Sequence, residues 1–130
     1  MKIVLIEDDA VYAEFVSKSL KHPEREIRHF ISAEEALDYI QSNSVDIVII
    51  DYKLPGMSGI EFFMKIRDKI KFSSGLKAIM MSALDDGRMV LTFIQKGVRD
   101  YVIKDEYVIE SLAAILEGRE NDMLFYGVEG

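Results

Sequence analysis

The sequence predicts an α/β protein with a doubly wound, five-stranded parallel sheet between two layers of helices, a three-layer αβα arrangement. Short runs of consecutive apolar residues, typical of strands buried on both faces, alternate five times with amphipathic stretches of helical period. Such a β-α order requires crossovers that place helices on both faces of the sheet. The length of 130 residues suits one domain, since domains average roughly 150 residues.

The five expected strands differ in strength. Residues 3–6 and 45–50 form the strongest strand signals, because their aliphatic residues are almost unbroken. Residues 27–31 give a weaker strand, which we place near an edge of the sheet. The fourth and fifth strands are expected over residues 77–81 and 99–103.

Start and stop signals define the first three helices. An amphipathic stretch over residues 11–20 ends before His22-Pro23, because proline cannot continue a helix. Ser32 and Ser58 each stand three residues before a glutamate, which is the pattern of a capping box. The two helices that follow them carry apolar residues at helical spacing: Ala33, Ala36, Leu37 and Ile40 in one, and Ile60, Phe63, Ile66 and Ile70 in the other.

The last two helices are expected over about residues 85–96 and 106–117, with Gly97 and Gly118 as their stops. These assignments place the folded domain at residues 1–118. Residues 119–130 carry a small apolar patch within a Gly-rich, acidic segment, and we interpret them as a docked tail or the stub of a linker.

Composition excludes several classes of protein. Sixteen Lys and Arg against 23 Asp and Glu give a net charge of −7, so direct nucleic-acid binding, which needs a basic face, is not expected. The chain has no cysteine, which excludes disulfides, thiolate metal sites and a cysteine nucleophile. No apolar run is long enough to span a membrane or to serve as a secretory signal, so we expect a cytoplasmic protein.

Polar side chains gather where the predicted strands end. In an open parallel sheet this edge holds the ligand site, and four of the five strand ends carry an ionisable or hydroxyl residue: Glu7-Asp8-Asp9, Asp51, Ser82 and Lys104. Any one of them could simply cap a helix, the role we assign to Asp9. Together, however, the carboxylates would repel one another unless a cation joined them. A shallow, all-oxygen site favours Mg²⁺ over Ca²⁺.

These residues resemble the motifs of the receiver domain of bacterial two-component response regulators, which has the CheY-like, flavodoxin-like (βα)5 fold. The resemblance covers residues 1–118 and rests on four segments: Leu5-Ile6-Glu7-Asp8-Asp9, Ile49-Ile50-Asp51-Tyr52-Lys53-Leu54-Pro55-Gly56-Met57-Ser58-Gly59, Met81-Ser82-Ala83 and Asp100-Tyr101-Val102-Ile103-Lys104. The second segment holds the loop Asp-x-x-Leu-Pro-Gly-Met-x-Gly, which is strong evidence by itself.

The resemblance implies that Asp51 is a phosphoacceptor. It would take a phosphoryl group from a histidine kinase or a histidine phosphotransfer protein, and the chain would catalyse only its own phosphorylation and dephosphorylation. Mg²⁺, for which Mn²⁺ can substitute, would be held by Asp8, Asp51, the backbone carbonyl of Lys53 and, through water, Glu7. Lys104 and Ser82 would contact the phosphoryl group. Ser82 and Tyr101 would then move together as a switch that controls a downstream protein or an output domain.

One position departs from the family's usual pattern, and two others affect the expected rate of hydrolysis. Asp105 follows Lys104 where the family usually has proline after a cis bond, so we expect either a trans bond with a rearranged loop or a strained cis bond, because cis non-proline bonds cost roughly 3 kcal/mol. Lys53 and Leu84 occupy the positions that govern access of the hydrolytic water. Neither side chain can orient that water, which predicts a long-lived aspartyl phosphate.

Other functions remain as alternatives. A receiver whose site has decayed would act as a phosphorylation-independent interaction module. A hydrolase of the haloacid-dehalogenase type also uses an aspartate nucleophile and Mg²⁺, but its nucleophile ends the first strand, whereas Asp51 ends the third. Flavodoxin-type FMN binding is disfavoured because the acidic run at residues 7–9 would repel the phosphate. A dimer of the chain that forms on phosphorylation is also compatible with the sequence.

Overall fold

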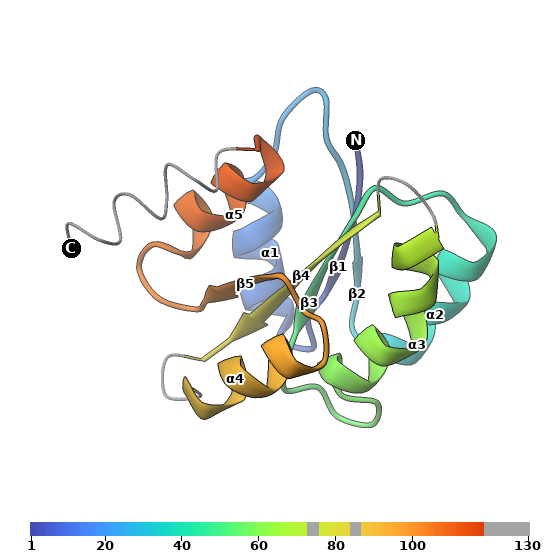
Figure 1. The fold of residues 1–130 in the computed structure, drawn as a ribbon. Coiled ribbons are helices and arrows are strands. Elements are labelled where there is room, and N and C mark those ends of the chain that lie inside the picture. The colour runs from blue at the N-terminus through green and yellow to red at the C-terminus, as the bar shows by residue number, and fades with distance from the viewer. Residues whose placement is uncertain (73–75, 84–86, 119–130) are drawn as a thin grey trace.

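The computed structural model of the chain describes residues 1–72, 76–83 and 87–118 and contains one five-stranded parallel sheet of order β2-β1-β3-β4-β5 (Figure 1). The strands are β1 Lys2–Ile6, β2 Glu26–Phe30, β3 Ile47–Asp51, β4 Lys77–Ser82 and β5 Asp100–Ile103. The weak second strand lies at an edge, as its sequence predicts. The predicted doubly wound fold is confirmed.

Five helices alternate with these strands: α1 Ala10–Ser19, α2 Ala33–Ser42, α3 Gly59–Phe72, α4 Gly87–Gln95 and α5 Val108–Leu116. The predicted caps form. Asp9 Oδ1 accepts hydrogen bonds from two backbone N–H groups at the start of α1. Ser32 Oγ accepts one from Glu35 N, and Ser58 Oγ accepts one from Glu61 N, each at 3.2 Å. Each of these caps satisfies an N–H group that has no partner within its own helix.

Alternate residues of the strands face two separate apolar cores. Ile3, Leu5 and Ile49 pack against α1 and α5 on one face of the sheet. Val4 and Ile50 pack against α2 and α3 on the opposite face, which the side chain of Phe93 from α4 also joins. Figure 1 shows α1 beside α5, and α2 beside α3, with the sheet between the two pairs. The central strands are therefore buried on both faces, which explains their unbroken aliphatic sequences.

The ends of several elements differ slightly from prediction. The last helix begins at Val108 rather than near Glu106, because Asp105 Oδ1 accepts a hydrogen bond from Tyr107 N at 2.9 Å and holds the preceding residues in a turn. Gly97 and Gly118 have φ angles of 99° and 73° and end α4 and α5 as predicted. The expected start of the fourth helix at residue 85 and the segment 119–130 lie outside the described residues.

The bond between Lys104 and Asp105 is trans, as are all peptide bonds of the described residues. Of the two outcomes that the sequence predicts for this position, the trans bond is therefore the one observed. No helix within the described ranges is both long enough and apolar enough to cross a membrane.

Candidate functional site

Sheet register brings the predicted site residues together at the edge where the strands end. Ile6 of β1 lies beside Ile50 of β3, so the residues that follow them, Glu7 and Asp51, are neighbours. Ser82 of β4 lies beside Ile103 of β5, so Lys104, which follows Ile103, lies beside the end of β4. A backbone hydrogen bond of 2.8 Å from Lys104 N to Ser82 O fixes that position. Residues far apart in the sequence thus share one site because parallel strands end at the same level.

Three carboxylates, those of Glu7, Asp8 and Asp51, form an acidic cluster in which one oxygen from each group lies within 4.8 Å of the others. Glu7 is 1% exposed and Asp51 6% exposed, whereas Asp8 is open to solvent. Asp9 is directed to its capping role, as predicted. An all-oxygen cluster with one open side fits a hard divalent cation that keeps part of its water shell.

The ammonium group of Lys104 lies inside this acidic cluster. Its Nζ is 2.6 Å from Glu7 Oε1 and 3.1 Å from Asp51 Oδ2, and the Lys104 side chain is 20% exposed. One cation therefore bridges the two buried carboxylates. The remaining excess of negative charge leaves the site able to attract a second cation.

Burial and charge shift the pKa values of this pair. Burial raises the pKa of Glu7 from 4.5 to about 7, although the hydrogen bond from Lys104 opposes the change. Burial also disfavours the charged form of Lys104, but its bonds to Glu7 and the charge of Asp51 prevail and raise the pKa of the ammonium. Lys104 therefore remains a cation at neutral pH, while Glu7 changes its charge close to neutrality.

Ser82 presents a buried hydroxyl to the site. The residue is 1% exposed, and its Oγ has no hydrogen-bond partner within the described part of the chain. A buried hydroxyl without a partner is costly, by roughly 1–3 kcal/mol. Tyr101, its predicted partner in the switch, is 39% exposed and directed outward in this conformation. An inward movement of Tyr101 stays a prediction.

The loop after β3 packs closely on the backbone of Asp51. A Cβ atom built on Gly59 would lie 2.4 Å from Asp51 O and 3.0 Å from the Cα of Tyr52. Gly59 N also donates a hydrogen bond of 3.1 Å to Tyr52 O. The glycine is needed here because a side chain would push the loop away from the acceptor strand.

For the two residues predicted to affect hydrolysis of the aspartyl phosphate, that role stays a prediction. Lys53 lies on the same loop and is exposed. Leu84 lies outside the described residues.

Two further residues contact the site without having been predicted from the sequence. Tyr12 on α1 lies beneath the ammonium of Lys104, with Nζ 4.6 Å from the centre of its ring. His29 on β2 has its Nε2 2.7 Å from the backbone carbonyl of Glu7. Tyr12 lies three residues after the Asp9 cap and so shares its end of the helix, a spacing that could have identified it. His29 depends on the β1–β2 register, for which the sequence holds no local signal.

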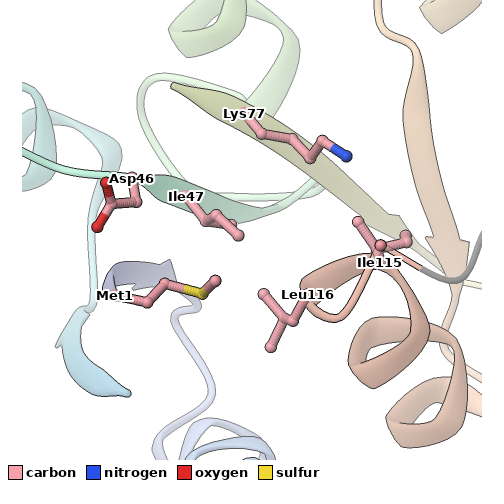
Figure 2. Close-up of a pocket in the computed structure, with 7 residues that line it drawn as sticks. Met1, Asp46, Ile47, Lys77, Ile115 and Leu116 are labelled. Atoms are coloured by element: carbon pink, nitrogen blue, oxygen red, sulfur yellow. The ribbon is translucent and has the colours of Figure 1, made fainter. Parts of the chain in front are cut away.

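A separate pocket of about 430 Å³ opens at the opposite end of the sheet, where the strands begin (Figure 2). Its lining is mostly apolar and includes Met1, Ile47, Ile115 and Leu116. Asp46, also in the lining, already accepts a hydrogen bond of 2.7 Å from Lys2 N. In parallel α/β sheets ligands bind at the carboxyl ends of the strands, so the acidic cluster is the candidate site and this pocket is distinct from it.

Comparison with known proteins agrees with this geometry. A family model for the response regulator receiver domain matches residues 3–117. Regulatory protein VanR of Enterococcus faecium is 30% identical over 128 residues, which make up 98% of this chain and 54% of VanR. The chain spans about half the length of the first regulatory relatives it matches.

Solved structures show the same fold. The response regulator TrrA of Thermotoga maritima, solved in complex with Mg²⁺ and beryllofluoride, has 28% identity and a TM-score of 0.74, with 89% of this chain and 96% of that chain covered. A CheY-like receiver domain protein of Methanospirillum hungatei has 23% identity and a TM-score of 0.75, with 92% and 94% covered.

Proposed function

The chain belongs to the response regulator receiver domain family, and we propose that Asp51 is the residue in it that accepts a phosphoryl group. One observation carries the proposal: the buried Asp51 carboxylate lies both within the acidic cluster and 3.1 Å from the Lys104 ammonium. A nucleophilic carboxylate, a site for a divalent cation and a fixed positive charge are what phosphoryl transfer requires. The donor is a phosphohistidine on a histidine kinase or a histidine phosphotransfer protein.

In the proposed reaction, a carboxylate oxygen of Asp51 forms a bond to phosphorus while the phosphorus–nitrogen bond of the donor breaks. The electron pair of that bond stays on the imidazole nitrogen, which can then take up a proton. No electrons are gained or lost overall. Because the transition state is loose, the chain contributes mainly position and charge, and Asp51 is held in place as the last residue of a fully buried strand.

Lys104 and Ser82 are proposed to bind the transferred group. The Lys104 ammonium is already 3.1 Å from Asp51 Oδ2, so it can neutralise charge on a phosphoryl oxygen attached there. The buried hydroxyl of Ser82, which has no partner among the described residues, can donate a hydrogen bond to a second oxygen. Phosphorylation would favour the conformation in which both contacts form, with Tyr101 turned inward.

A divalent cation fits the acidic cluster, whose donors are all carboxylate oxygens. We propose that Asp8 and Asp51 hold Mg²⁺, or Mn²⁺ in its place, with the Lys53 backbone carbonyl as a further ligand and Glu7 bound through water. When bound, the ion would neutralise charge on the oxygens of the phosphoryl group. The complex of the similar protein TrrA with Mg²⁺ and beryllofluoride supports this assignment.

The proposal extends to the organisation of the whole protein. Residues 1–118 would form the receiver, and residues 119–130 a tail or the beginning of a linker. Since the chain spans 54% of VanR, an attached output domain or a separate downstream protein would read the switch. We expect cytoplasmic action, with no activity other than the chain's own phosphorylation and dephosphorylation.

Intact-protein mass tests the phosphoacceptor role. After incubation with acetyl phosphate and Mg²⁺ the mass should rise by one phosphoryl group, and the gain should be absent without Mg²⁺ and in Asp51→Asn. If a phosphohistidine donor also left the mass unchanged, the chain would be a decayed receiver that acts as an interaction module, and the proposal would fail.

A further inference from the structure

Among the described residues, the Lys104 ammonium contacts two anionic groups and one neutral aromatic ring. Its Nζ lies near Glu7 Oε1 at 2.6 Å and Asp51 Oδ2 at 3.1 Å, and it also lies over the face of the Tyr12 ring, 4.6 Å from the ring centre. The face of an aromatic ring is negative and attracts a cation within about 6 Å of its centre. Tyr12 is therefore the neutral contact of this ammonium.

The position of the ring is fixed by its own surroundings. Tyr12 N donates a hydrogen bond of 3.1 Å to Asp9 Oδ1, so the residue sits in the capped first turn of α1. Its ring packs against Phe15, with the two centres 5.8 Å apart, and against the core shared by α1 and α5. The hydroxyl is buried and makes no hydrogen bond to any described residue. Packing of the ring, and not its hydroxyl, therefore holds Tyr12 in place.

The two anionic contacts of Lys104 involve groups that have other partners in the proposed function. A divalent cation would compete with the ammonium for both carboxylates, and phosphorylation would replace the Asp51 carboxylate charge with that of the phosphoryl group. The ring of Tyr12 is uncharged and binds neither a hard cation nor a phosphoryl group. It is the contact that Lys104 can keep in the metal-free, the metal-bound and the phosphorylated states of the site.

We propose that Tyr12 is a positioning residue, whose ring face keeps the Lys104 ammonium directed at the acceptor oxygen when the carboxylates turn to the metal ion and the phosphoryl group. This role rests on the proposed function of Asp51. Without the ring, the flexible four-carbon stem of Lys104 would lose its remaining fixed contact once the carboxylates are engaged. The ammonium would then have to be ordered again in each transfer event, and transfer would slow.

Rates of phosphorylation by acetyl phosphate at saturating Mg²⁺ test the role. Tyr12→Leu retains an apolar side chain but has no ring face, and it should lower the maximal rate roughly five- to thirtyfold, since cation–π contacts at desolvated sites contribute about 1–2 kcal/mol. Tyr12→Phe keeps the ring and should restore the rate to within twofold of wild type. Equal rates in Tyr12→Leu and wild type, or equal losses in Tyr12→Leu and Tyr12→Phe, would overturn the proposal.

Tyr39→Leu is the matched control. Its ring also lies beneath a cation, with Arg28 Cζ 4.8 Å from the ring centre, but it is on α2, whose side chains pack on the face of the sheet opposite α1. This variant should phosphorylate at the wild-type rate. A loss equal to that of Tyr12→Leu would mean that ring removal weakens the fold in general, and would contradict a specific role.

An NMR measurement separates this inference from the phosphoacceptor assignment. The ε-methylene protons of Lys104, assigned with Lys104→Arg, should be shifted upfield by the ring in wild type and Tyr12→Phe but not in Tyr12→Leu. The shift should persist after addition of Mg²⁺ and beryllofluoride, and its disappearance would overturn the proposal. This test requires no phosphorylation, so it stands even if Asp51 fails to accept a phosphoryl group.

Discussion

Lys104 Nζ lies 2.6 Å from Oε1 of Glu7, although the two residues are 97 positions apart in the sequence. The contact joins the loop after β5 to the end of β1, across the ends of β3 and β4. Because Glu7 is 1% exposed, its charge is poorly solvated and depends on this ammonium. The contact therefore links the stability of the metal-free chain to pH.

The first prediction concerns this pH dependence, measured in EDTA so that no divalent metal ion is bound. Burial raises the pKa of Glu7 from 4.5 to about 7, so between these values the folded chain holds a proton that the unfolded chain has released. The free energy of unfolding of wild type, relative to Glu7→Gln, should therefore fall as pH rises through this window, by the order of 1 kcal/mol per pH unit. Urea unfolding at pH 5, 6, 7 and 8 measures it. A difference between the two proteins that is constant over this range would contradict the burial argument.

The second prediction concerns Ser82, whose buried hydroxyl has no partner among the described residues. Ser82→Ala should raise the free energy of unfolding of the unphosphorylated chain by about 1 kcal/mol, because it removes an unsatisfied buried group. It should also reduce the stabilisation conferred by Mg²⁺ with beryllofluoride, since one contact to the phosphoryl mimic is lost. Thermal unfolding with and without the mimic measures both effects.

Ser32→Ala serves as the control for that experiment, because Ser32 Oγ accepts a hydrogen bond from Glu35 N at 3.2 Å. Its loss should destabilise the chain by about 1 kcal/mol and leave the response to beryllofluoride unchanged. If Ser82→Ala destabilised the unphosphorylated chain as Ser32→Ala does, the Ser82 hydroxyl would already have a partner in that state.

The third prediction concerns the loop that packs on the acceptor. Gly59→Ala places a Cβ 2.4 Å from Asp51 O, and backbone atoms cannot move aside as a flexible side chain can. We expect a loss of roughly 1–3 kcal/mol in unfolding free energy, together with slower phosphorylation. Gly118→Ala is the control, since a Cβ there meets nothing within 4 Å and introduces only the strain of its φ of 73°. A Gly59→Ala variant as stable and as active as wild type would show that this loop can relax.

The fourth prediction concerns the lifetime of the phosphorylated state. Replacing Lys53 with Asn and Leu84 with Glu introduces groups that can orient a water molecule, which should shorten the lifetime of the aspartyl phosphate roughly tenfold. Loss of the added mass after removal of acetyl phosphate measures it. Lys65→Asn, at an exposed lysine on α3, should have no effect. Equal lifetimes in wild type and the double variant would exclude a hydrolytic role for the two positions.

The sequence predicts most of this fold because local and long-range signals agree. The aliphatic run that ends at Asp51 forms a strand buried on both faces, and Ser32 and Ser58 cap their helices as their spacing predicts. The helix α5, which begins two residues later than predicted, is preceded by a turn that Asp105 closes through its side chain. Periodicity cannot reveal such a turn, because a side-chain hydrogen bond competes locally with the helix.

That the polar residues at the strand ends lie together was predictable from the sequence, but their contacts were not. Strand order places Glu7, Asp51 and Lys104 at one edge, yet which carboxylate the ammonium contacts depends on side-chain geometry. The position of Tyr12 beneath Lys104 follows from packing between α1 and the loop after β5. The spacing of Tyr12 from Asp9 places it at that end of α1, but no local rule pairs it with Lys104, which lies near the other end of the sequence.

The most direct test of the central claim identifies the residue that carries the phosphoryl group. After phosphorylation by acetyl phosphate with Mg²⁺, borohydride reduction converts an aspartyl phosphate to homoserine, which peptide mass mapping can locate. The account predicts homoserine at position 51 alone, and none without Mg²⁺. Homoserine at position 8, or an equivalent reduction product at Glu7, would contradict the assignment of Asp51 as the phosphoacceptor.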